Sequence, residues 1–327
     1  MFSDIFLQIQ DYLLYCKSKN LSTKTIKSYE QSLKLFERYC TDNKIQSLLQ
    51  ITPQAVLHYI QYIQERGKYT AVSNDNSKEM NHPDKRKDLG KQVSPATINN
   101  YIRNLKAFFT YCIEFELIKK NPMKKIKYLP YTRKAKGFIT DEQYQLLLKC
   151  FDLSRFYEYR DFVIVNLLFD TGMRISECLL IQTNDIDLMK RCILLLAENT
   201  KGKKDRYVFF SMEMSVILKR WLKYKDIYTN TTFLFTTQNG NNINNSIFEK
   251  NFKKYCGRIN LNDITPHALR NNFAKRFLMN GGNIYTLSQI LGHSSVLITE
   301  KAYLDLTDDD IRQGYQNFSP LSKMKNK

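Results

Sequence analysis

The chain of 327 residues lacks the features of a membrane or secreted protein. It contains no run of about eighteen apolar residues, the length that a membrane-spanning helix needs. Its N-terminus has an acid close to the start and apolar residues at helical spacing, which is unlike a secretory signal peptide. We therefore expect a cytoplasmic protein that does not bind a membrane.

Cysteine pairs, histidines and acidic clusters are also scarce. The seven cysteines are dispersed without a CxxC pair, which is typical of reduced thiols and predicts neither a disulfide framework nor a zinc site. The one acidic run, Asp308 to Asp310, indicates the first turn of a helix rather than a metal site. Of only four histidines, His58 and His82 lie in segments that suggest no catalytic role.

Positive charge is present in excess. The 50 lysines and arginines outnumber the 32 acidic residues and give a formal net charge of +18. Nucleic acid is the commonest partner of such a protein, because binding neutralises phosphates and releases counterions. Charge alone would also fit an anionic membrane surface or simple solubility. With 43% hydrophobic residues, a chain of this length suggests about two domains, each with its own core.

The first part of the chain predicts a small all-helical domain over residues 1–120. Thr52-Pro53 and Ser94-Pro95 repeat one helix start, a capping hydroxyl followed by proline in the first turn. Four helices are expected, over residues 3–19, 22–43, 53–67 and 95–118. Between the last two, residues 68–93 are polar, lack hydrophobic periodicity and carry the basic run from Lys85 to Lys87, so we predict a long mobile loop.

A basic segment follows this domain. Residues from Lys119 to Gly137 include eight basic residues, two prolines and no acid. This composition predicts an extended linker at 121–137, before a second domain with a C-terminal tail at 138–327. A positively charged linker between two basic domains favours a protein that closes around a DNA duplex.

The second domain begins with a capping box from Thr140 to Gln143. A later helix ends at Thr171-Gly172, and the chain restarts with Arg174 in the first turn of the next helix. Helix N-termini favour anions, so an arginine there makes sense if it faces a phosphate together with the backbone amides. The alternative is a surface arginine that pairs with Glu177 at i+3.

Two apolar runs, residues 192–197 and 205–210, enclose a turn with three lysines and predict a β-hairpin. Lys201, beside a glycine in this turn, would be a positioned cation or proton donor, although hairpin tips are often simply rich in lysine. Three further elements are expected: a helix at about 212–226, a short strand over 233–237 and a helix at about 246–259. Trp221, the one tryptophan, is expected in the core.

The stretch from Pro266 to Tyr303 carries the remaining reactive side chains. His267 and Arg270 are three residues apart and share one face of a helix begun by the proline. His293 follows the Leu-Gly that ends the next apolar run. Tyr303 lies ten residues further on, in a segment that predicts one more short helix.

The motifs TGMRISE, TKGKKDR, PHALR and LGHSS, followed by a tyrosine, occur in this order. Through them the sequence resembles the tyrosine recombinase family, also called the phage integrase family. The resemblance implies a mainly α fold with a small β-sheet, made of an all-helical SAM-like core-binding domain and an α+β catalytic domain. It also implies a site-specific DNA recombinase that cuts and rejoins strands through a 3′-phosphotyrosine intermediate, without a metal, a cofactor or ATP.

The resemblance assigns a role to each reactive side chain. Arg174, Arg270 and His293 would neutralise the scissile phosphate. His267 is the candidate base, and Lys201 would protonate the leaving 5′ oxygen.

Tyr303 would be the nucleophile. Many relatives place this tyrosine nine residues after the histidine of LGH, whereas the separation here is ten. We still choose Tyr303, because Tyr285 precedes the motif and Tyr315 lies beyond the acidic run.

The expected partner is double-stranded DNA with a specific recombination site, bound by a homo-tetramer on two duplexes, because recombination needs four strand cleavages. The polar loop favours an integrase or transposase of a mobile element. Two alternatives remain: a type IB topoisomerase, which also uses a tyrosine, and a DNA-binding accessory protein that has lost the reaction.

Overall fold

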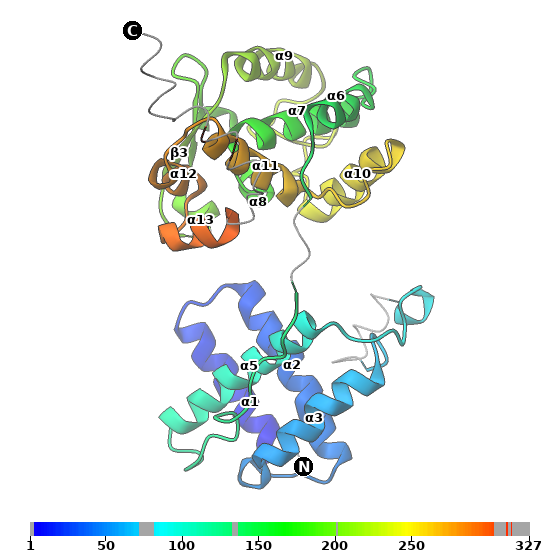
Figure 1. Cartoon of the computed structure of the whole chain (residues 1–327), viewed down its shortest axis with the longest axis vertical. Coiled ribbons are helices and arrows are strands. Elements are labelled where there is room, and N and C mark those ends of the chain that lie inside the picture. Colours follow the sequence, from blue (N-terminus) through cyan, green and yellow to red (C-terminus); the bar gives the residue numbers. More distant parts are fainter. Residues whose placement is uncertain are drawn as a thin grey trace. The chain divides into compact units, whose positions relative to one another are not determined.

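A computed structural model describes residues 3–71, 82–132, 137–200 and 202–303, together with residues 312 and 315. The chain forms two compact units, unit 1 from Met1 to Arg133 and unit 2 from Lys134 to Lys327 (Figure 1). No helix in the described part has the length and apolar character needed to cross a membrane.

The regular elements in the described part of unit 1 are all helices. Its α-helices are α1 (Asp4–Ser18), α2 (Thr23–Asp42), α3 (Pro53–Arg66) and α5 (Pro95–Glu114), with 3₁₀ turns η1 (Leu48–Gln50) and η2 (Pro83–Lys85). Each α-helix begins at a hydroxyl that accepts a hydrogen bond from the backbone amide three residues on; these caps are Ser3, Ser22, Thr52 and Ser94. The two predicted starts with proline in the first turn are therefore confirmed.

The core of unit 1 is rich in aromatic rings. Phe36 lies at its centre, with its ring centroid 4.9 Å from that of Tyr59 and 6.1 Å from that of Phe109. Helix α5 is held to α2 by a buried polar contact as well, because the Asn104 amide donates to the Ser32 hydroxyl at 2.8 Å. The aromatic contacts and this hydrogen bond hold the helices of unit 1 together.

The two described ends of the predicted 68–93 loop are joined. The Lys68 amide donates to the Lys91 carbonyl at 2.8 Å, and the Gly90 amide donates to the Lys68 carbonyl at 2.9 Å. Gly67 has a positive φ of 77° and lies so close to Gly90 that a Cβ would collide with its carbonyl. The backbone thus closes the loop at its base, while residues 72–81 lie outside the described part of the chain.

The first part of the predicted linker packs against unit 1. Met123 and Ile126 are buried in the core of that unit. The Asn99 side chain also receives the Leu129 amide at 2.8 Å and donates to its carbonyl at 2.9 Å. Residues 121–129 are therefore folded onto unit 1 rather than extended, because their apolar side chains alternate with the lysines that dominate the composition.

Unit 2 contains helices and one small sheet. Its helices are α6 (Asp141–Lys149), α7 (Phe156–Thr171), α8 (Ile175–Cys178), α9 (Met212–Tyr228), α10 (Asn245–Arg258), α11 (Pro266–Met279), α12 (Ile284–Leu291) and α13 (Val296–Tyr303), with 3₁₀ turns η3 (Thr183–Asp185) and η4 (Ala197–Asn199). Helices α9 and α11 pack on α7, whose Val163, Ile164, Leu167 and Leu168 are fully buried. The predicted capping box is confirmed, since Thr140 and Gln143 exchange both hydrogen bonds.

The sheet is antiparallel, with the order β1-β2-β3. Its strands are β1 (Ile186–Asp187), β2 (Cys192–Leu195) and β3 (Arg206–Phe209). Ile193 pairs with Val208, which confirms the predicted hairpin, although both strands are shorter than the apolar runs. On β3, Tyr207 and Phe209 are exposed, and Arg206 shares the inner face with buried Val208.

The predicted strand over 233–237 is wrong. Phe233 and Thr236 make only isolated bridges, to Gln182 and Asn242. The segment is apolar because Leu234 and Phe235 fill the core beside Trp221, whose indole donates to the Leu234 carbonyl at 2.9 Å. The tryptophan is fully buried, as predicted.

Candidate active site

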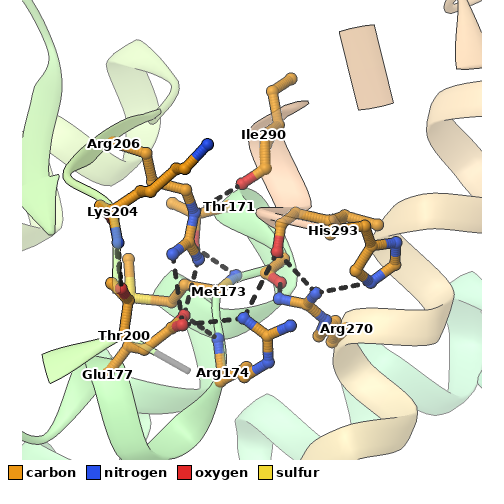
Figure 2. A network of polar contacts seen from close by, with 12 residues as sticks. Thr171, Met173, Arg174, Glu177, Thr200, Lys204, Arg206, Arg270, Ile290 and His293 are labelled. Atoms are coloured by element: carbon orange, nitrogen blue, oxygen red, sulfur yellow. Dashed lines mark hydrogen bonds and ion pairs between the residues drawn. The ribbon is translucent and has the colours of Figure 1, made fainter. Parts of the chain in front are cut away.

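Polar side chains from four elements of unit 2 meet around the ends of α7 and α12. Arg174 is the N-cap of α8, Arg206 is the first residue of β3, and Arg270 lies on α11. His293 directly follows Gly292, the C-cap of α12. Figure 2 shows Glu177 between the guanidinium groups of Arg174 and Arg206, and Arg270 beside His293.

Two glycines end helices at this point. Gly172 closes α7 with φ +65°, and a Cβ there would overlap the Phe273 ring. Gly292 closes α12 with φ +63°, and a Cβ there would lie 2.9 Å from the Arg206 guanidinium carbon. Each position needs glycine for its left-handed backbone and for the space it leaves. The two predicted helix ends are therefore where the site is built.

Arg270 is held by the carbonyls that these helix ends leave free. It is 2% exposed; Nη1 donates to the Gly172 carbonyl at 2.9 Å and Nη2 donates to the Leu291 carbonyl at 2.8 Å. Carbonyls at helix C-termini have no partner within the helix and carry partial negative charge, so they suit a guanidinium group. The orientation of the planar fork is thus fixed before any ligand binds.

Arg174 is paired with Glu177, as the alternative interpretation of the sequence expected. Its Nη1 donates to Glu177 Oε1 at 2.9 Å, and its backbone amide donates to Oε2 at 2.9 Å. The pair is not a surface feature, however, because the carboxylate side chain is only 1% exposed while that of Arg174 is 25% exposed. The carboxylate therefore holds the arginine in place and leaves part of it open to solvent.

Arg206 is a member of this cluster that the sequence did not single out. Nη2 donates to Glu177 Oε2 at 2.6 Å, Nη1 donates to Oε1 at 3.2 Å, and Nε donates to the Ile290 carbonyl at 3.1 Å. Burial raises the pKa of the Glu177 carboxyl, but the Arg206 guanidinium and then Arg174 outweigh it and hold the pKa below its ordinary value. Its place on the inner face of β3, beside Val208, is the signal that could have identified Arg206.

Replacing Glu177 by glutamine should destabilise unit 2. The change leaves two arginines around a neutral amide, so we expect the free energy of unfolding to fall by about 2–4 kcal/mol, less than for a fully buried pair. Because folding lowers the pKa of Glu177, its contribution is present at neutral pH and is lost as the pH falls below its unfolded value. Urea unfolding at pH 7 measures the effect. Glu249→Gln, at an exposed position on α10, is the control, and equal midpoints for the two variants would contradict the prediction.

His293 uses both ring nitrogens. Nδ1 lies 2.7 Å from the Thr299 hydroxyl, and Nε2 lies 3.0 Å from Arg270 Nη2. Burial lowers the pKa of the imidazole, and the charges of Arg270, Arg174, Arg206 and His267 lower it further, to about 4. The ring is therefore neutral at pH 7.

The remaining predicted site residues are only partly described. His267 is exposed in the first turn of α11, one turn before Arg270. Lys201 and the side chain of Tyr303 lie outside the described residues, although the backbone of Tyr303 ends α13. Next to Lys201, the Thr200 hydroxyl accepts a hydrogen bond from the Lys204 amide at 3.3 Å and donates one to the Lys204 carbonyl at 3.1 Å. The structure thus brings together Arg174, Arg270 and His293, with His267 on the same helix as Arg270.

The cluster holds three guanidinium groups and one carboxylate, which pairs with Arg174 and Arg206 but not with Arg270, so positive charge is in surplus. Planar donors at fixed positions match the non-bridging oxygens of a phosphate group. The arrangement suits a phosphodiester as ligand.

Comparison with known families agrees with this chemistry. Residues 137–310 match the phage integrase family, and residues 5–128 match the phage integrase SAM-like domain. The chain therefore belongs to the phage integrase family of tyrosine recombinases, enzymes that break and rejoin DNA. The predicted fold class is confirmed: a mainly helical protein with a three-stranded antiparallel sheet and a SAM-like N-terminal domain.

Similar proteins span nearly the whole chain. Tyrosine recombinase XerD of Staphylococcus epidermidis is 26% identical over 322 residues, covering 95% of this chain and 98% of the relative. Tyrosine recombinase XerC of Pediococcus pentosaceus is 26% identical over 313 residues, covering 93% and 94%.

Solved structures share the fold. The Tn1549 transposon integrase in complex with transposon right end DNA is 21% identical, with a TM-score of 0.71 and coverage of 95% of this chain and 99% of that one. The XerH site-specific recombinase bound to its difH substrate is 20% identical, with a TM-score of 0.63 and coverage of 93% and 82%.

Proposed function

We propose that this recombinase acts at a specific DNA site and that Tyr303 attacks the scissile phosphate to form a 3′-phosphotyrosyl link and a free 5′ hydroxyl. The observation that carries the proposal is the cluster of Arg174, Arg270 and His293 beside α13, the helix that ends at Tyr303. Helix α13 contacts both α11 and α12, so the nucleophile and the cations belong to one packed group of helices.

The cations would lower the barrier by neutralising the phosphate. A phosphodiester resists attack because its oxygens repel the nucleophile, and charge grows on them in the pentacoordinate transition state. Arg174 and Arg270 would each bind a non-bridging oxygen, and His293 would donate a further hydrogen bond. Because backbone carbonyls and Glu177 already orient the two forks, little reorganisation is needed during the reaction.

Proton transfer would complete the chemistry. An unperturbed tyrosine has a pKa of roughly 10, so about one in a thousand is ionised at neutral pH. His267, one turn from Arg270 on α11, would accept the Tyr303 proton, and Lys201 would donate a proton to the leaving 5′ oxygen. The phosphotyrosyl ester conserves the energy of the phosphodiester, so a 5′ hydroxyl from a second duplex can reverse the reaction without ATP or a metal.

Recombination of two duplexes requires four cleavages, so we propose a homo-tetramer on DNA, with unit 1 as the core-binding domain. Among the solved relatives, XerH is bound to a difH substrate, and a λ integrase dimer is bound to a core site. The similarity to a transposon integrase supports an integrase or transposase role for this chain. The seven free cysteines fit a reducing compartment, so we place the reaction in the cytoplasm.

The test is to map the covalent intermediate. A duplex selected from a random-sequence pool by binding to the protein, hereafter the selected duplex, is nicked at successive positions to trap cleavage. Mass spectrometry of the digested adduct should find the nucleotide on the peptide that contains Tyr303. A nucleotide on the peptide of Tyr285 or Tyr315, or no adduct at any nick position, would contradict the proposal.

A further inference from the structure

The hydrogen-bond partners of His293 fix the position of its proton. Arginine has only donors, so Nε2, at 3.0 Å from Arg270 Nη2, must accept and carries no hydrogen. A neutral imidazole has one N–H, which is then at Nδ1 and donates to the Thr299 hydroxyl at 2.7 Å. In an imidazolium, Nε2 would also carry a hydrogen, and two N–H donors would face each other across 3.0 Å. His293 is therefore the Nδ1–H tautomer.

This tautomer is unsuited to the role proposed for His293. A hydrogen bond from Nε2 to a phosphate oxygen needs a proton at Nε2. Protonating the whole ring is costly beside the guanidinium groups of Arg270, Arg174 and Arg206, whose charges all act on it. The neutral ring can instead lose the Nδ1 proton to water and gain one from water at Nε2, with no change in charge.

Such an exchange requires a partner for Nδ1 that can both accept and donate. A hydroxyl does both, because it rotates to suit its neighbour. Thr299 is fully buried on α13, so the 2.7 Å contact is held by packing rather than by chance at the surface. When the proton leaves Nδ1, the Thr299 O–H can turn and donate to it.

We propose that Thr299 is a positioning residue that allows neutral His293 to change from the tautomer that accepts from Arg270 to the tautomer that donates to the scissile phosphate. The proposal rests on the function proposed above for His293. DNA would trigger the change, because a phosphate oxygen accepts from Nε2 and from Arg270 Nη2 at once and so replaces the contact between them.

The same contact ties the histidine to the nucleophile's helix. Thr299 lies four residues before Tyr303 on α13, which is about one helical turn. A shift of α13 that carries Thr299 away from His293 would break this contact. The histidine thus reaches its donating state only when the helix of the nucleophile is in place.

Nitrogen NMR of histidine tests the tautomers directly. The protein has four histidines, so ¹⁵N-histidine labelling gives few signals, and a His293→Gln variant assigns the relevant one. The free protein at pH 7 should show His293 with its proton at Nδ1. The Tyr303→Phe protein bound to the selected duplex should show it at Nε2. A proton at Nε2 in the free protein, or no change on binding, would overturn the proposal.

Two variants test the hydroxyl. Thr299→Val keeps the shape but removes the hydroxyl, and should slow adduct formation by about 10–100-fold, the usual cost of losing a group that orients a catalytic side chain. Thr299→Ser should restore the rate to within about threefold of wild type. Affinity for the selected duplex should be unchanged in both variants. A merely structural role for Thr299 would not give different rates for the valine and serine variants.

The outcomes separate this inference from the proposed function. A Thr299→Val protein that forms the adduct on Tyr303 at the normal rate would overturn the inference and leave the proposed function intact. A wild-type protein without an adduct on Tyr303 would overturn the function itself. Should Thr299→Val fail to fold, the serine variant and the NMR of the wild-type protein still decide the question.

Discussion

A Tyr303→Phe variant is expected to form no covalent adduct with the selected duplex. The substitution removes one hydroxyl and leaves the ring, so the loss should affect chemistry alone. Removing a nucleophile costs on the order of 10⁶-fold in rate, which is below detection in an adduct assay. Gel electrophoresis under denaturing conditions measures the adduct, and a mobility shift under native conditions should give an affinity within about twofold of wild type.

Tyr285→Phe is the matched control for this variant. Tyr285 lies in the first turn of α12 and is 65% exposed, so removing its hydroxyl should leave the adduct unchanged. Tyr315, also exposed, offers a second comparison. An adduct that persists in Tyr303→Phe, or disappears in Tyr315→Phe, would show that the nucleophile has been misassigned.

An Arg270→Lys variant should lose about 10²–10³-fold in the rate of adduct formation, the usual cost of removing a fixed donor to developing charge. Lysine keeps the positive charge but has no planar fork. It cannot reach the Gly172 carbonyl, the Leu291 carbonyl and His293 together, as the two terminal nitrogens of the arginine do. The measurement is single-turnover cleavage of the nicked duplex with enzyme in excess.

Arg220→Lys, at an exposed position on α9, provides the comparison and should retain the wild-type rate. Thermal unfolding of both variants by circular dichroism separates a loss of chemistry from a loss of structure. If Arg270→Lys folds and cleaves as fast as Arg220→Lys, the arginine is not part of the phosphate site.

Local signals in the sequence were enough to predict much of this fold. The hydroxyl and proline pairs at Thr52 and Ser94 start helices because a side-chain oxygen replaces a missing backbone partner. Gly172 and Gly292 end helices because they adopt positive φ at low cost. Such signals depend on neighbours within a turn of helix, so they can be identified without knowledge of the tertiary structure.

Contacts between distant segments could not be predicted in this way. Arg206 lies 29 residues beyond Glu177; alternation along β3 places it on the inner face, but nothing local indicates that Glu177 is its partner there. Met123 and Ile126 lie in a sequence dominated by lysines, and their burial depends on contacts with the core of unit 1, which form only in the folded protein. The run at 233–237 was predicted as a strand because it is short and apolar. Burial of an irregular segment beside Trp221 requires the same kind of residues as a buried strand, so the sequence does not distinguish the two.

The pairing of Lys68 with Gly90 and Lys91 has a consequence for how this protein tolerates change. Those hydrogen bonds fix the distance between Lys68 and the Gly90-Lys91 pair. The packing of helices α3 and α5 therefore depends little on the number of residues between these two points. Doubling the length of a segment whose ends are joined adds only about 0.6 kcal/mol of loop-closure entropy. The stretch between these anchors can therefore grow, shrink or accept an inserted peptide tag in the course of evolution or engineering, at little expense to the helices that it connects.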